Sequence, residues 1–247
     1  MRALITNDDG IDSPGLHALA AAARDHGLDV VVAAPARQSS GSSASITAAE
    51  DDGRIHIDRR ELPGLAGIPA FAVRGAPGLI ALIASNGAFG DKPDLVLSGI
   101  NHGANVGNAI LHSGTVGAAL TGGMGGARGL AVSLDVGFEP EDFAWDAAAA
   151  VTRTVLPTLL ALPPGTVLNL NVPNVHTEAD VREATLAPFG IVQTTMHRDG
   201  EHHVRLAVED LPNDPVPGSD AALLAEGYAT LTSITAVSAV PLPSGAR

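Results

Sequence analysis

Short apolar segments alternate with longer helical patterns over the first two thirds of the chain. The apolar run at residues 3–6 predicts a buried strand, and residues 29–34 predict a second one. Between them, residues 14–23 carry apolar side chains at helical spacing and open with Pro14-Gly15. A strand, a helix and a strand in this order predict parallel pairing with a right-handed crossover.

The alternation continues as far as residue 172. Further strands are expected at residues 54–58, 70–73, 93–101, 130–134 and 167–172. Further helices are expected at residues 77–84, 115–127 and 141–160. This order predicts the α/β fold class, with a Rossmann-like, mostly parallel sheet flanked by helices.

The pattern changes after residue 173. Residues 180–217 alternate weakly, carry charge and end in a Pro-rich stretch, which predicts an extended hairpin or arm rather than a second core. A helix from about residue 220 and a final strand then complete the chain. We therefore expect a single domain over residues 1–247, with its core at about 1–175 and 218–240.

Composition restricts the chemistry. The 247 residues carry a net charge of −13, which argues against binding a nucleic-acid polymer and requires a local cation if the substrate is anionic. The absence of cysteine excludes disulfides, thiolate nucleophiles and zinc-thiolate sites. No leader pattern and no apolar run of membrane-spanning length is seen, so we expect a cytoplasmic protein without membrane contact.

Two adjacent carboxylates, Asp8 and Asp9, directly follow the first predicted strand. Neighbouring side chains on a strand point to opposite faces, so both can face one ligand only if the chain turns there. Gly10 permits that turn because glycine adopts positive φ readily. An ordinary Asp-Asp-Gly turn is one interpretation. A cation site is the other, because α/β sheets bind ligands at the carboxyl ends of their strands.

Two more strand ends carry oxygen donors. A Ser/Gly-rich loop at residues 38–45 follows the second long strand, and Asn101 ends the strand at 93–101. By composition alone the loop is a flexible surface segment, and Asn101 alone is an ordinary turn residue. Together with Asp8 and Asp9 they form a set of hard oxygen ligands, which predicts one Mg²⁺ or Mn²⁺ ion.

These residues also carry a resemblance to a known family. The chain resembles the SurE family of stationary-phase survival proteins, which are metal-dependent nucleoside monophosphate phosphatases. The matching segments span nearly the whole chain in the family's order. They are residues 6–11 with Pro14-Gly15, residues 34–35 with Ser40-Gly41, and residues 93–101, 113–116, 168–173 and 226–228.

The resemblance implies a site, position by position. It implies that the metal is held by Asp8, Asp9, Ser40 and Asn101. Ser40 is preferred over Ser39 because the family's ligand lies five residues after the Pro that here is Pro35. Asp8 and Asp9 are also the expected catalytic residues, with Asp8 orienting the attacking water. The residues expected at the substrate and its phosphate are Asn7, Gly41, Asn105, Ser113, Gly114 and Thr115. Thr115 and its neighbours are expected to cap the helix that begins there, where exposed amides suit a phosphate.

The chain also departs from the family's pattern, although at none of the metal positions. Ala76 and Leu79 stand where the family usually has a Thr and an Asp, His112 stands in place of a Tyr, and Thr121 in place of a Glu. These departures bear on substrate preference and on the support of the site.

The histidines leave alternatives open. His102 and His112 flank the loops expected at the site, so either one is a candidate for binding phosphate or moving a proton. His197, His202 and His203 resemble a weak metal cluster, but the polar stretch around them favours a solvated face.

The expected function is hydrolysis of nucleoside 5′- or 3′-monophosphates by a metal-dependent phosphomonoesterase. One alternative is a metal- and nucleotide-binding protein with little catalysis. The other is a phosphatase for another small phosphate, such as a sugar phosphate or short polyphosphate. The resemblance further implies that the arm reaches another subunit, giving a homodimer or homotetramer.

Overall fold

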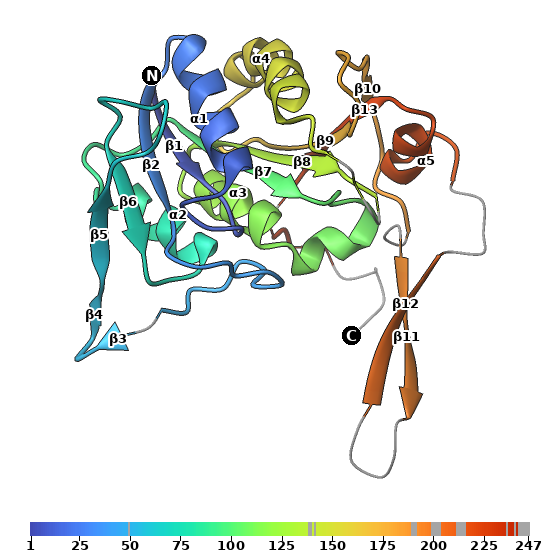
Figure 1. The fold of residues 1–247 in the computed structure, drawn as a ribbon, viewed down its shortest axis with the longest axis horizontal. Coiled ribbons are helices and arrows are strands. Elements are labelled where there is room, and N and C mark those ends of the chain that lie inside the picture. Colours follow the sequence, from blue (N-terminus) through green and yellow to red (C-terminus); the bar gives the residue numbers. More distant parts are fainter. Residues whose placement is uncertain are drawn as a thin grey trace.

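A nine-stranded sheet forms the centre of the computed structural model (Figure 1). The structure describes residues 1–48, 50–137, 140, 142–188, 192–198, 204–210, 216–235, 237–239 and 241, with backbone alone at 50–51, 192–198 and 204–210. In spatial order the strands are β10 (Val181–Glu183), β13 (Ala229–Ile234), β9 (Val167–Pro173), β8 (Arg128–Asp135), β7 (Leu95–His102), β1 (Arg2–Thr6), β2 (Asp29–Pro35), β6 (Ala70–Val73) and β5 (Ile57–Arg60).

The sheet is mostly parallel, as predicted. Every neighbouring pair from β9 across to β6 runs parallel, whereas β13 is antiparallel to β9 and β5 is antiparallel to β6. A separate two-stranded sheet joins β3 (Glu50–Asp51) to β4 (Arg54–Ile55). The α/β, Rossmann-like fold class is confirmed.

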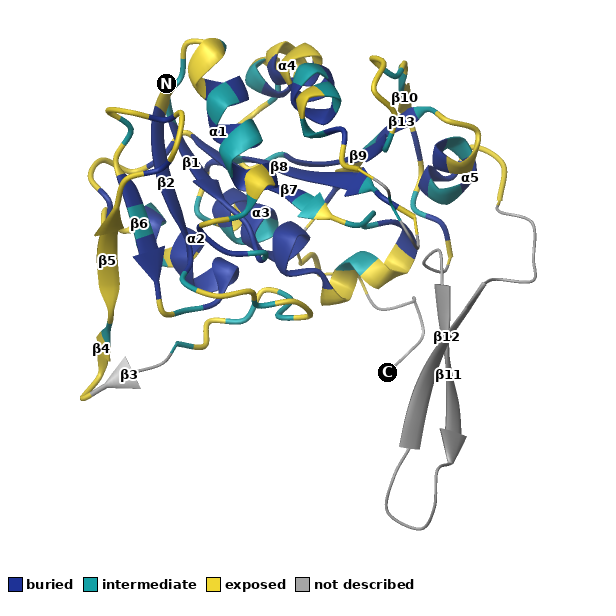
Figure 2. Cartoon of the chain, in the orientation of Figure 1, coloured by how far each residue is buried: buried dark blue, intermediate teal, exposed yellow. Residues whose placement is uncertain are grey.

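Helices cover both faces of this sheet. Residues of α1 (Pro14–Asp25) and α4 (Trp145–Ala161) share one apolar cluster with the sheet, and residues of α2 (Pro77–Ser85) and α3 (Gly114–Met124) share another. Because both faces are covered, the central strands are buried along most of their length, whereas the edge strand β5 is exposed (Figure 2). This is why the parallel strands appear in the sequence as continuous apolar runs.

The order of the strands creates a crevice at β1. The chain leaves β1 through α1 to β2 on one side, and later returns to β7 on the other side. The loops that follow β1 and β7 therefore diverge at their carboxyl ends, which is the position where open α/β sheets bind ligands. The register between β7 and β8 shifts between Ser98 and Asn101, so the last residues of β7 are displaced from the regular ladder beside this crevice.

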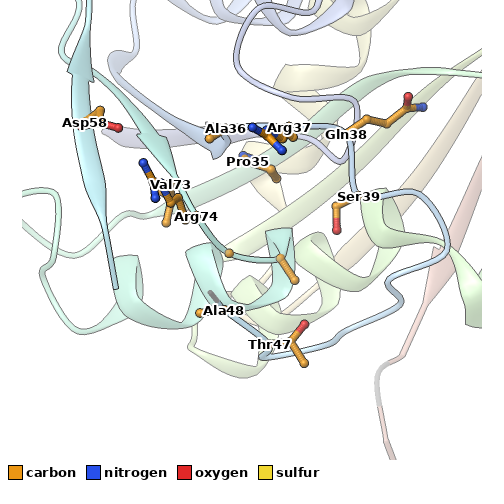
Figure 3. Close-up of a pocket in the computed structure, with 12 residues that line it drawn as sticks. Pro35, Ala36, Arg37, Gln38, Ser39, Thr47, Ala48, Asp58, Val73 and Arg74 are labelled. Carbon is orange, nitrogen blue, oxygen red and sulfur yellow. The ribbon is translucent and has the colours of Figure 1, made fainter. Parts of the chain in front are cut away.

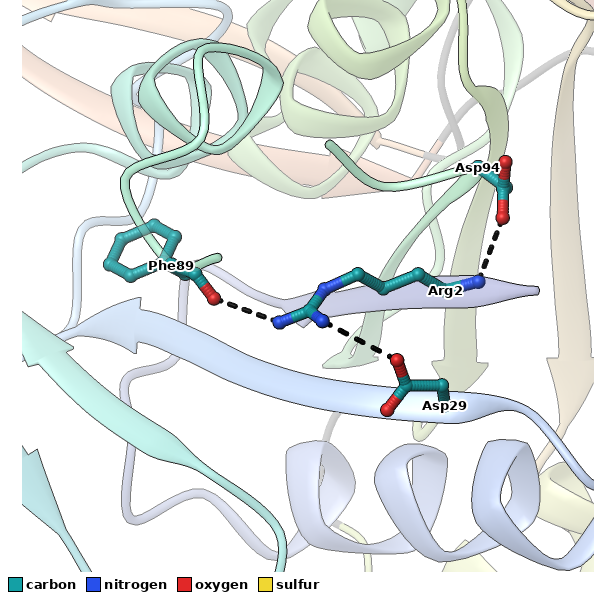
Figure 4. Close-up of polar contacts among 4 residues, drawn as sticks. All are labelled: Arg2, Asp29, Phe89 and Asp94. Atoms are coloured by element: carbon teal, nitrogen blue, oxygen red, sulfur yellow. Dashed lines mark hydrogen bonds and ion pairs between the residues drawn. The ribbon is translucent and has the colours of Figure 1, made fainter. Parts of the chain in front are cut away.

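Arg2 holds together the amino-terminal ends of the central strands, opposite the ends that carry Asp8 and Asn101 (Figure 4). Its backbone N–H donates to Asp94 Oδ2 at 2.8 Å, its Nη2 donates to the Phe89 carbonyl at 2.9 Å, and its Nη1 lies 3.4 Å from Asp29 Oδ2. These contacts join the amino ends of β1 and β2 to the segment that enters β7. We assign Arg2 a structural role, because it lies at the edge remote from the crevice.

The C-terminal arm is a hairpin, as predicted. β11 (Val192–Arg198) pairs antiparallel with β12 (Val204–Asp210), and the pair projects away from the nine-stranded sheet (Figure 1). Residues 181–183 differ from the prediction, because as β10 they pair with β13 and belong to the main sheet. The cluster of His197, His202 and His203 falls on residues whose side chains lie outside the described structure.

The remaining elements are short helices. A 3₁₀ helix, η1 (Gly107–His112), was not expected from the sequence, and α5 (Asp220–Ala225) lies where a helix was predicted. α4 begins four residues later than expected, at Trp145. Over the part of the chain that the structure describes, no helix is long and apolar enough to cross a membrane.

Gly15 permits a close contact between α1 and β7. A Cβ at this position would lie 2.1 Å from the carbonyl oxygen of Ile100 and 3.0 Å from the Trp145 ring. Backbone cannot yield as a flexible side chain can, so we expect Gly15→Ala to destabilise the fold by about 1 to 3 kcal/mol, as overpacking does. A lowered Tm in thermal unfolding checks this. Gly→Ala in an unstrained helix stabilises instead, so an unchanged or raised Tm contradicts the close contact.

Candidate metal-binding site

The turn after β1 is fixed by Asn7 and Gly10. The Asn7 side chain is fully buried, its Oδ1 accepts from the Gly10 N–H at 3.1 Å, and its Nδ2 donates to the Gly10 carbonyl at the same distance. Gly10 has φ +106°, as the predicted turn requires. We expected the Asn7 side chain at the substrate. Both of its polar atoms instead form hydrogen bonds that stabilise the turn containing Asp8 and Asp9.

Asp8 is held against the N-terminus of α3. It is only 5% exposed, and its Oδ1 accepts from the Thr115 hydroxyl at 2.5 Å. A Cβ on Gly114 would lie 2.8 Å from Asp8 Oδ2, so only glycine allows the helix this close. Among the described residues, no hydrogen bond is recorded for Oδ2, and this oxygen is available to a cation.

Asp9 is anchored from the other side of the crevice. Its carboxylate is half-buried, and its Oδ2 accepts from the backbone N–H of His102 at 3.2 Å. Its Oδ1 makes no hydrogen bond within the described part of the chain. Each of the two neighbouring carboxylates therefore uses one oxygen to fix its orientation and leaves the other one for a ligand.

Burial raises the pKa of both carboxylates above the ordinary value. For Asp8 the hydrogen bond from the Thr115 hydroxyl opposes this effect, and the nearby charge of Asp9 adds to the rise in pKa. For Asp9 the backbone N–H and the charge of His102 oppose the rise. The net rise means that the protein alone does not compensate the buried negative charge, which favours a cation at this position.

Asn101 lies next in the chain to the residue that holds Asp9. Its Nδ2 donates to the Gly103 carbonyl at 2.7 Å, so the amide nitrogen is occupied and Oδ1 remains as the oxygen available to a cation. Asn101 lies at the end of β7, one residue before the His102 N–H that holds Asp9. The structure thus brings Asp8, Asp9 and Asn101 to one place.

The Ser/Gly loop lies against Asp8 rather than free on the surface. The Ser39 N–H donates to the Asp8 carbonyl at 2.7 Å, and the Ser43 hydroxyl donates to the Leu111 carbonyl at 2.7 Å. Ser40 is exposed, and its Oγ accepts from Gln38 Nε2 at 3.0 Å. The following Gly41 is exposed, with φ +70°. The ligand role of Ser40 and the substrate role of Gly41 stay predictions.

The start of α3 corrects the predicted cap. Ser113 is the N-cap, and its Oγ accepts from the Val116 N–H at 3.1 Å, whereas the Thr115 hydroxyl goes to Asp8. Because Thr115 is fully buried, its side chain supports Asp8 instead of reaching the substrate. The first N–H groups of α3 lack acceptors within the helix, and that of Thr115 points at the Asp8 carboxylate, where it lowers the pKa.

Asn105 is held in place by partners that the sequence analysis missed. Its backbone N–H donates to Asn171 Oδ1, its carbonyl accepts from Asn169 and Asn171, and its Nδ2 donates to Ser133 Oγ, all at 2.8 to 2.9 Å. The signal was visible, because two asparagines interrupt the apolar strand β9. Asn105 thereby positions the loop after β7, and its contact with substrate stays a prediction.

Two further carboxylates support the site. The fully buried Asp220 accepts from the Gly107 N–H at 2.8 Å and from the Ala187 and Ala221 N–H groups at 2.9 Å. It therefore ties the loop after β7 to the C-terminal part of the chain. Asp135 ends β8, and burial raises its pKa. Neither was singled out from the sequence, although Asp135 follows a predicted strand directly.

His102 and His112, the two histidines that are candidates for a role at the site, are both exposed. The His102 ring lies 5.0 Å from the Phe143 ring, which stacks on Trp145 at 5.4 Å. His112 is exposed, and its carbonyl accepts from the Ser43 N–H. Proton transfer or phosphate binding by either imidazole stays a prediction.

The donor set fits a hard divalent cation. Asp8, Asp9 and Asn101 offer oxygen atoms only, which suit Mg²⁺ or Mn²⁺. The Ser42 Oγ is buried without a partner in the described structure and lies beside Gly114, so the pocket at Asp8 holds an unused polar atom. In the described part of the chain no group of three or more His, Asp or Glu gathers as a metal site, so a cation at Asp8 and Asp9 would depend on further oxygen ligands such as the amide of Asn101.

A family model described as "Survival protein SurE" matches residues 3–196. The chain belongs to the SurE family. A relative from Pseudomonas entomophila, named "5'-nucleotidase SurE", is 35% identical over 243 residues and covers 95% of this chain and 92% of its own. A relative of the same name from Symbiobacterium thermophilum is 39% identical over 242 residues, with 94% and 91% covered.

A solved structure agrees with this assignment. The crystal structure of the SurE protein from Aquifex aeolicus superimposes with a TM-score of 0.73 at 30% identity, covering 95% of this chain and 93% of that one. The resemblance drawn from the motif residues is therefore confirmed, together with the fold.

The departures from the SurE pattern lie beside the site rather than in it. Ala76 is the N-cap of α2 and offers no side-chain hydrogen bond there, and Leu79 is buried in the first turn of that helix. Thr121 donates to the Gly117 carbonyl at 2.7 Å within α3. None of them contacts Asp8 or Asp9 through a recorded hydrogen bond in the described structure.

We expect Asp9→Asn to separate function from folding. A raised pKa means that the folded state holds more protons than the unfolded state above pH 3.8, so the ionised carboxylate lowers stability as pH rises. The metal-free variant should therefore have an unchanged or raised Tm at pH 7, and the difference from wild type should shrink as pH falls through the raised pKa of Asp9 and should be absent below pH 3.8. It should also lose stabilisation by Mn²⁺.

Thermal unfolding with EDTA and with Mn²⁺ checks this prediction, and Asp91→Asn on an exposed loop serves as the matched control. An aspartate in an ordinary turn predicts the reverse result, namely a lowered Tm in EDTA and an unchanged response to Mn²⁺.

Proposed function

We propose that this SurE family member is a metal-dependent phosphomonoesterase that hydrolyses nucleoside 5′-monophosphates, and also 3′-monophosphates, in the cytoplasm. The observation that carries the proposal is the arrangement of Asp8 and Asp9, each with one oxygen fixed and one available, opposite the N-terminus of α3. The names of the relatives, 5'-nucleotidase SurE, support this substrate class.

We assign the metal to Asp8, Asp9, Ser40 and Asn101. A bound Mg²⁺ or Mn²⁺ ion supplies positive charge for a phosphoryl oxygen and promotes ionisation of water. The Thr115 hydroxyl and the Asn7 turn keep Asp8 in one orientation, so that its carboxylate can accept a hydrogen bond from the attacking water. This positioning needs no covalent bond between enzyme and phosphate.

The first turn of α3 holds the substrate phosphate. The amides at Gly114 and Thr115 and the positive end of the helix stabilise the charge that builds up on the phosphoryl oxygens. Water oxygen bonds to phosphorus, the bond from phosphorus to the ribose oxygen breaks, and the ribose oxygen takes a proton. His102 and His112 remain the two candidates for delivering that proton at the rim.

Metal dependence is the direct test of this function. After chelation with EDTA we expect no phosphate release from a panel of mononucleotides, and recovery on adding Mn²⁺ or Mg²⁺. Asp8→Asn and Asp9→Asn should each lower kcat/KM by at least about a hundredfold, because a ligand is lost, whereas Asp91→Asn should match wild type. Full turnover without metal overturns the proposal. Stabilisation by Mn²⁺ without phosphate release with any nucleotide identifies a binding protein instead.

We further propose that the β11–β12 hairpin pairs this chain with a second copy in a homodimer or homotetramer. Within the described structure the hairpin shares no ladder with the nine-stranded sheet, and an isolated two-stranded hairpin is marginally stable in water. Packing against another subunit would supply the burial that the hairpin lacks.

Replacing residues 190–205 by a short Gly/Ser linker should therefore lower the oligomeric state. Light scattering after size-exclusion chromatography measures it, and circular dichroism shows that the α/β core is retained. A monomeric full-length chain, or an oligomer that survives the replacement, rules out the assembly role of the hairpin.

A further inference from the structure

A cavity of about 690 Å³ opens beside the segment that follows β2 (Figure 3). It lies where β2 and β6 end, and its wall includes residues 35–39, 47–48 and 73–76 together with Asp58. β2 and β6 are paired up to Pro35 and Val73, so the segments that follow them leave the sheet side by side.

Two arginines line this cavity. Arg37 follows β2 and Arg74 follows β6, and both are exposed. In the described structure neither guanidinium makes a hydrogen bond or an ion pair. Asp58 is the one carboxylate among the described lining residues, and its Oδ1 already lies 2.9 Å from His56 Nε2. In a chain with a net charge of −13, this wall is therefore locally cationic.

The segment before α2 lines the same cavity. Gly75 and Ala76 line the cavity immediately before the helix, and Ala76 caps it without a side-chain hydrogen bond. The Ala76 N–H donates to the Thr47 carbonyl at 2.9 Å, and Ser39 and Thr47, which carry hydroxyl groups, also line the cavity. No aromatic ring belongs to the described lining, so the wall suits an anion better than a stacked base.

The cavity and the metal site share one short segment. Ser39 lines the cavity, while its N–H donates to the Asp8 carbonyl at 2.7 Å. A Cβ on Gly10 would lie 3.5 Å from the backbone carbon of Arg37, so the turn that carries the carboxylates touches the arginine segment. Residues 37–39 therefore join the wall of the cavity to the turn that carries the two carboxylates.

We propose that Arg37 and Arg74 form a second phosphate subsite. The proposal rests on the proposed phosphatase function and specifies its substrates as nucleotides that carry two phosphates at separate positions, such as nucleoside 3′,5′-bisphosphates. One phosphate lies at the metal site and is hydrolysed, and the other is held in the cavity. Guanidinium groups bind phosphate through paired charge-assisted hydrogen bonds, which a nucleobase does not require.

The reaction balances without another reactant. Water oxygen bonds to the phosphorus at the metal site, the ester bond to the ribose oxygen breaks, and that oxygen takes the proton. The phosphate in the cavity is unchanged, so the products are inorganic phosphate and a nucleoside monophosphate.

The test compares two substrates in wild type and variants, namely AMP and adenosine 3′,5′-bisphosphate with Mn²⁺. Wild type should have the higher kcat/KM for the bisphosphate. Arg37→Gln and Arg74→Gln should each raise KM for the bisphosphate about tenfold, in line with the loss of one charge-assisted contact, and leave kcat/KM for AMP unchanged. Arg153→Gln on the exposed face of α4 is the matched control and should alter neither substrate.

Calorimetry in EDTA measures the same subsite without turnover. The bisphosphate should bind more tightly than AMP, and this advantage should disappear in the Arg37→Gln/Arg74→Gln double variant. If the two nucleotides bind with equal affinity, or if the variants lose the same affinity for both, the proposed phosphate subsite is wrong. If inorganic phosphate added with AMP reproduces the bisphosphate signal, the cavity takes a free anion and the substrate assignment is wrong.

The two proposals fail in different ways. If AMP and the bisphosphate both remain intact with Mn²⁺, the phosphatase function is wrong, while calorimetry still decides whether the cavity binds phosphate. If AMP is hydrolysed but the bisphosphate has neither a higher kcat/KM nor a higher affinity than AMP, the phosphatase function is supported and the second subsite is wrong.

Discussion

Two neighbouring carboxylates held partly out of water are the constraint on which the rest of this structure depends. Burial raises the pKa of Asp8 and of Asp9, and their mutual repulsion adds to that of Asp8. Two like charges that are close together and partly buried destabilise the folded chain unless a positive charge or hydrogen-bond donors compensate them. The protein compensates in part, through the Thr115 hydroxyl and the His102 N–H, each of which fixes one oxygen. The other oxygen of each carboxylate accepts from no side chain in the described structure, so a divalent cation bound there would relieve the repulsion.

The surrounding backbone is arranged so that this pair can form. Asn7 closes the turn through two hydrogen bonds to Gly10, and Gly114 brings the start of α3 into contact with Asp8. Asn105 fixes the loop after β7, because its backbone and side chain are bound by β8 and β9. Because these contacts involve main-chain atoms, the ligand oxygens are positioned before any cation binds. Such preorganisation is what a catalytic metal site needs, since it avoids rearrangement during the reaction.

The fold and the carboxylates at the centre of the site were predictable from the local sequence pattern. The residues that hold these carboxylates and the nearby loops in place were not. Apolar runs gave the parallel strands, because a strand buried on both faces has no polar alternation, and Asp8, Asp9 and Asn101 were found because each directly follows or ends such a run. Thr115 was assigned to the helix cap, and only the packing of α3 on β1 shows its hydroxyl on Asp8. The bond between Asp220 and the Gly107 N–H joins residues 113 positions apart, and no local pattern encodes it. The cationic cavity could not be predicted for the same reason, because only the pairing of β2 with β6 brings the segments of Arg37 and Arg74 together.

Charge then determines where an anionic substrate can bind. A chain with net charge −13 repels phosphates over most of its surface, so binding depends on the few places where the sign is reversed. The cation at Asp8 and Asp9 would be one such place, and the Arg37–Arg74 wall is the second, joined to the first by residues 37–39. The departures at Ala76 and Leu79 lie at the start of α2, next to this wall, and leave the aspartate of the usual pattern absent there. A carboxylate near the two arginines would compete with a phosphate for their hydrogen bonds. Its absence therefore acts in the same direction as the arginines, because no acidic side chain among residues 73–79 competes with a bound anion for their guanidinium groups.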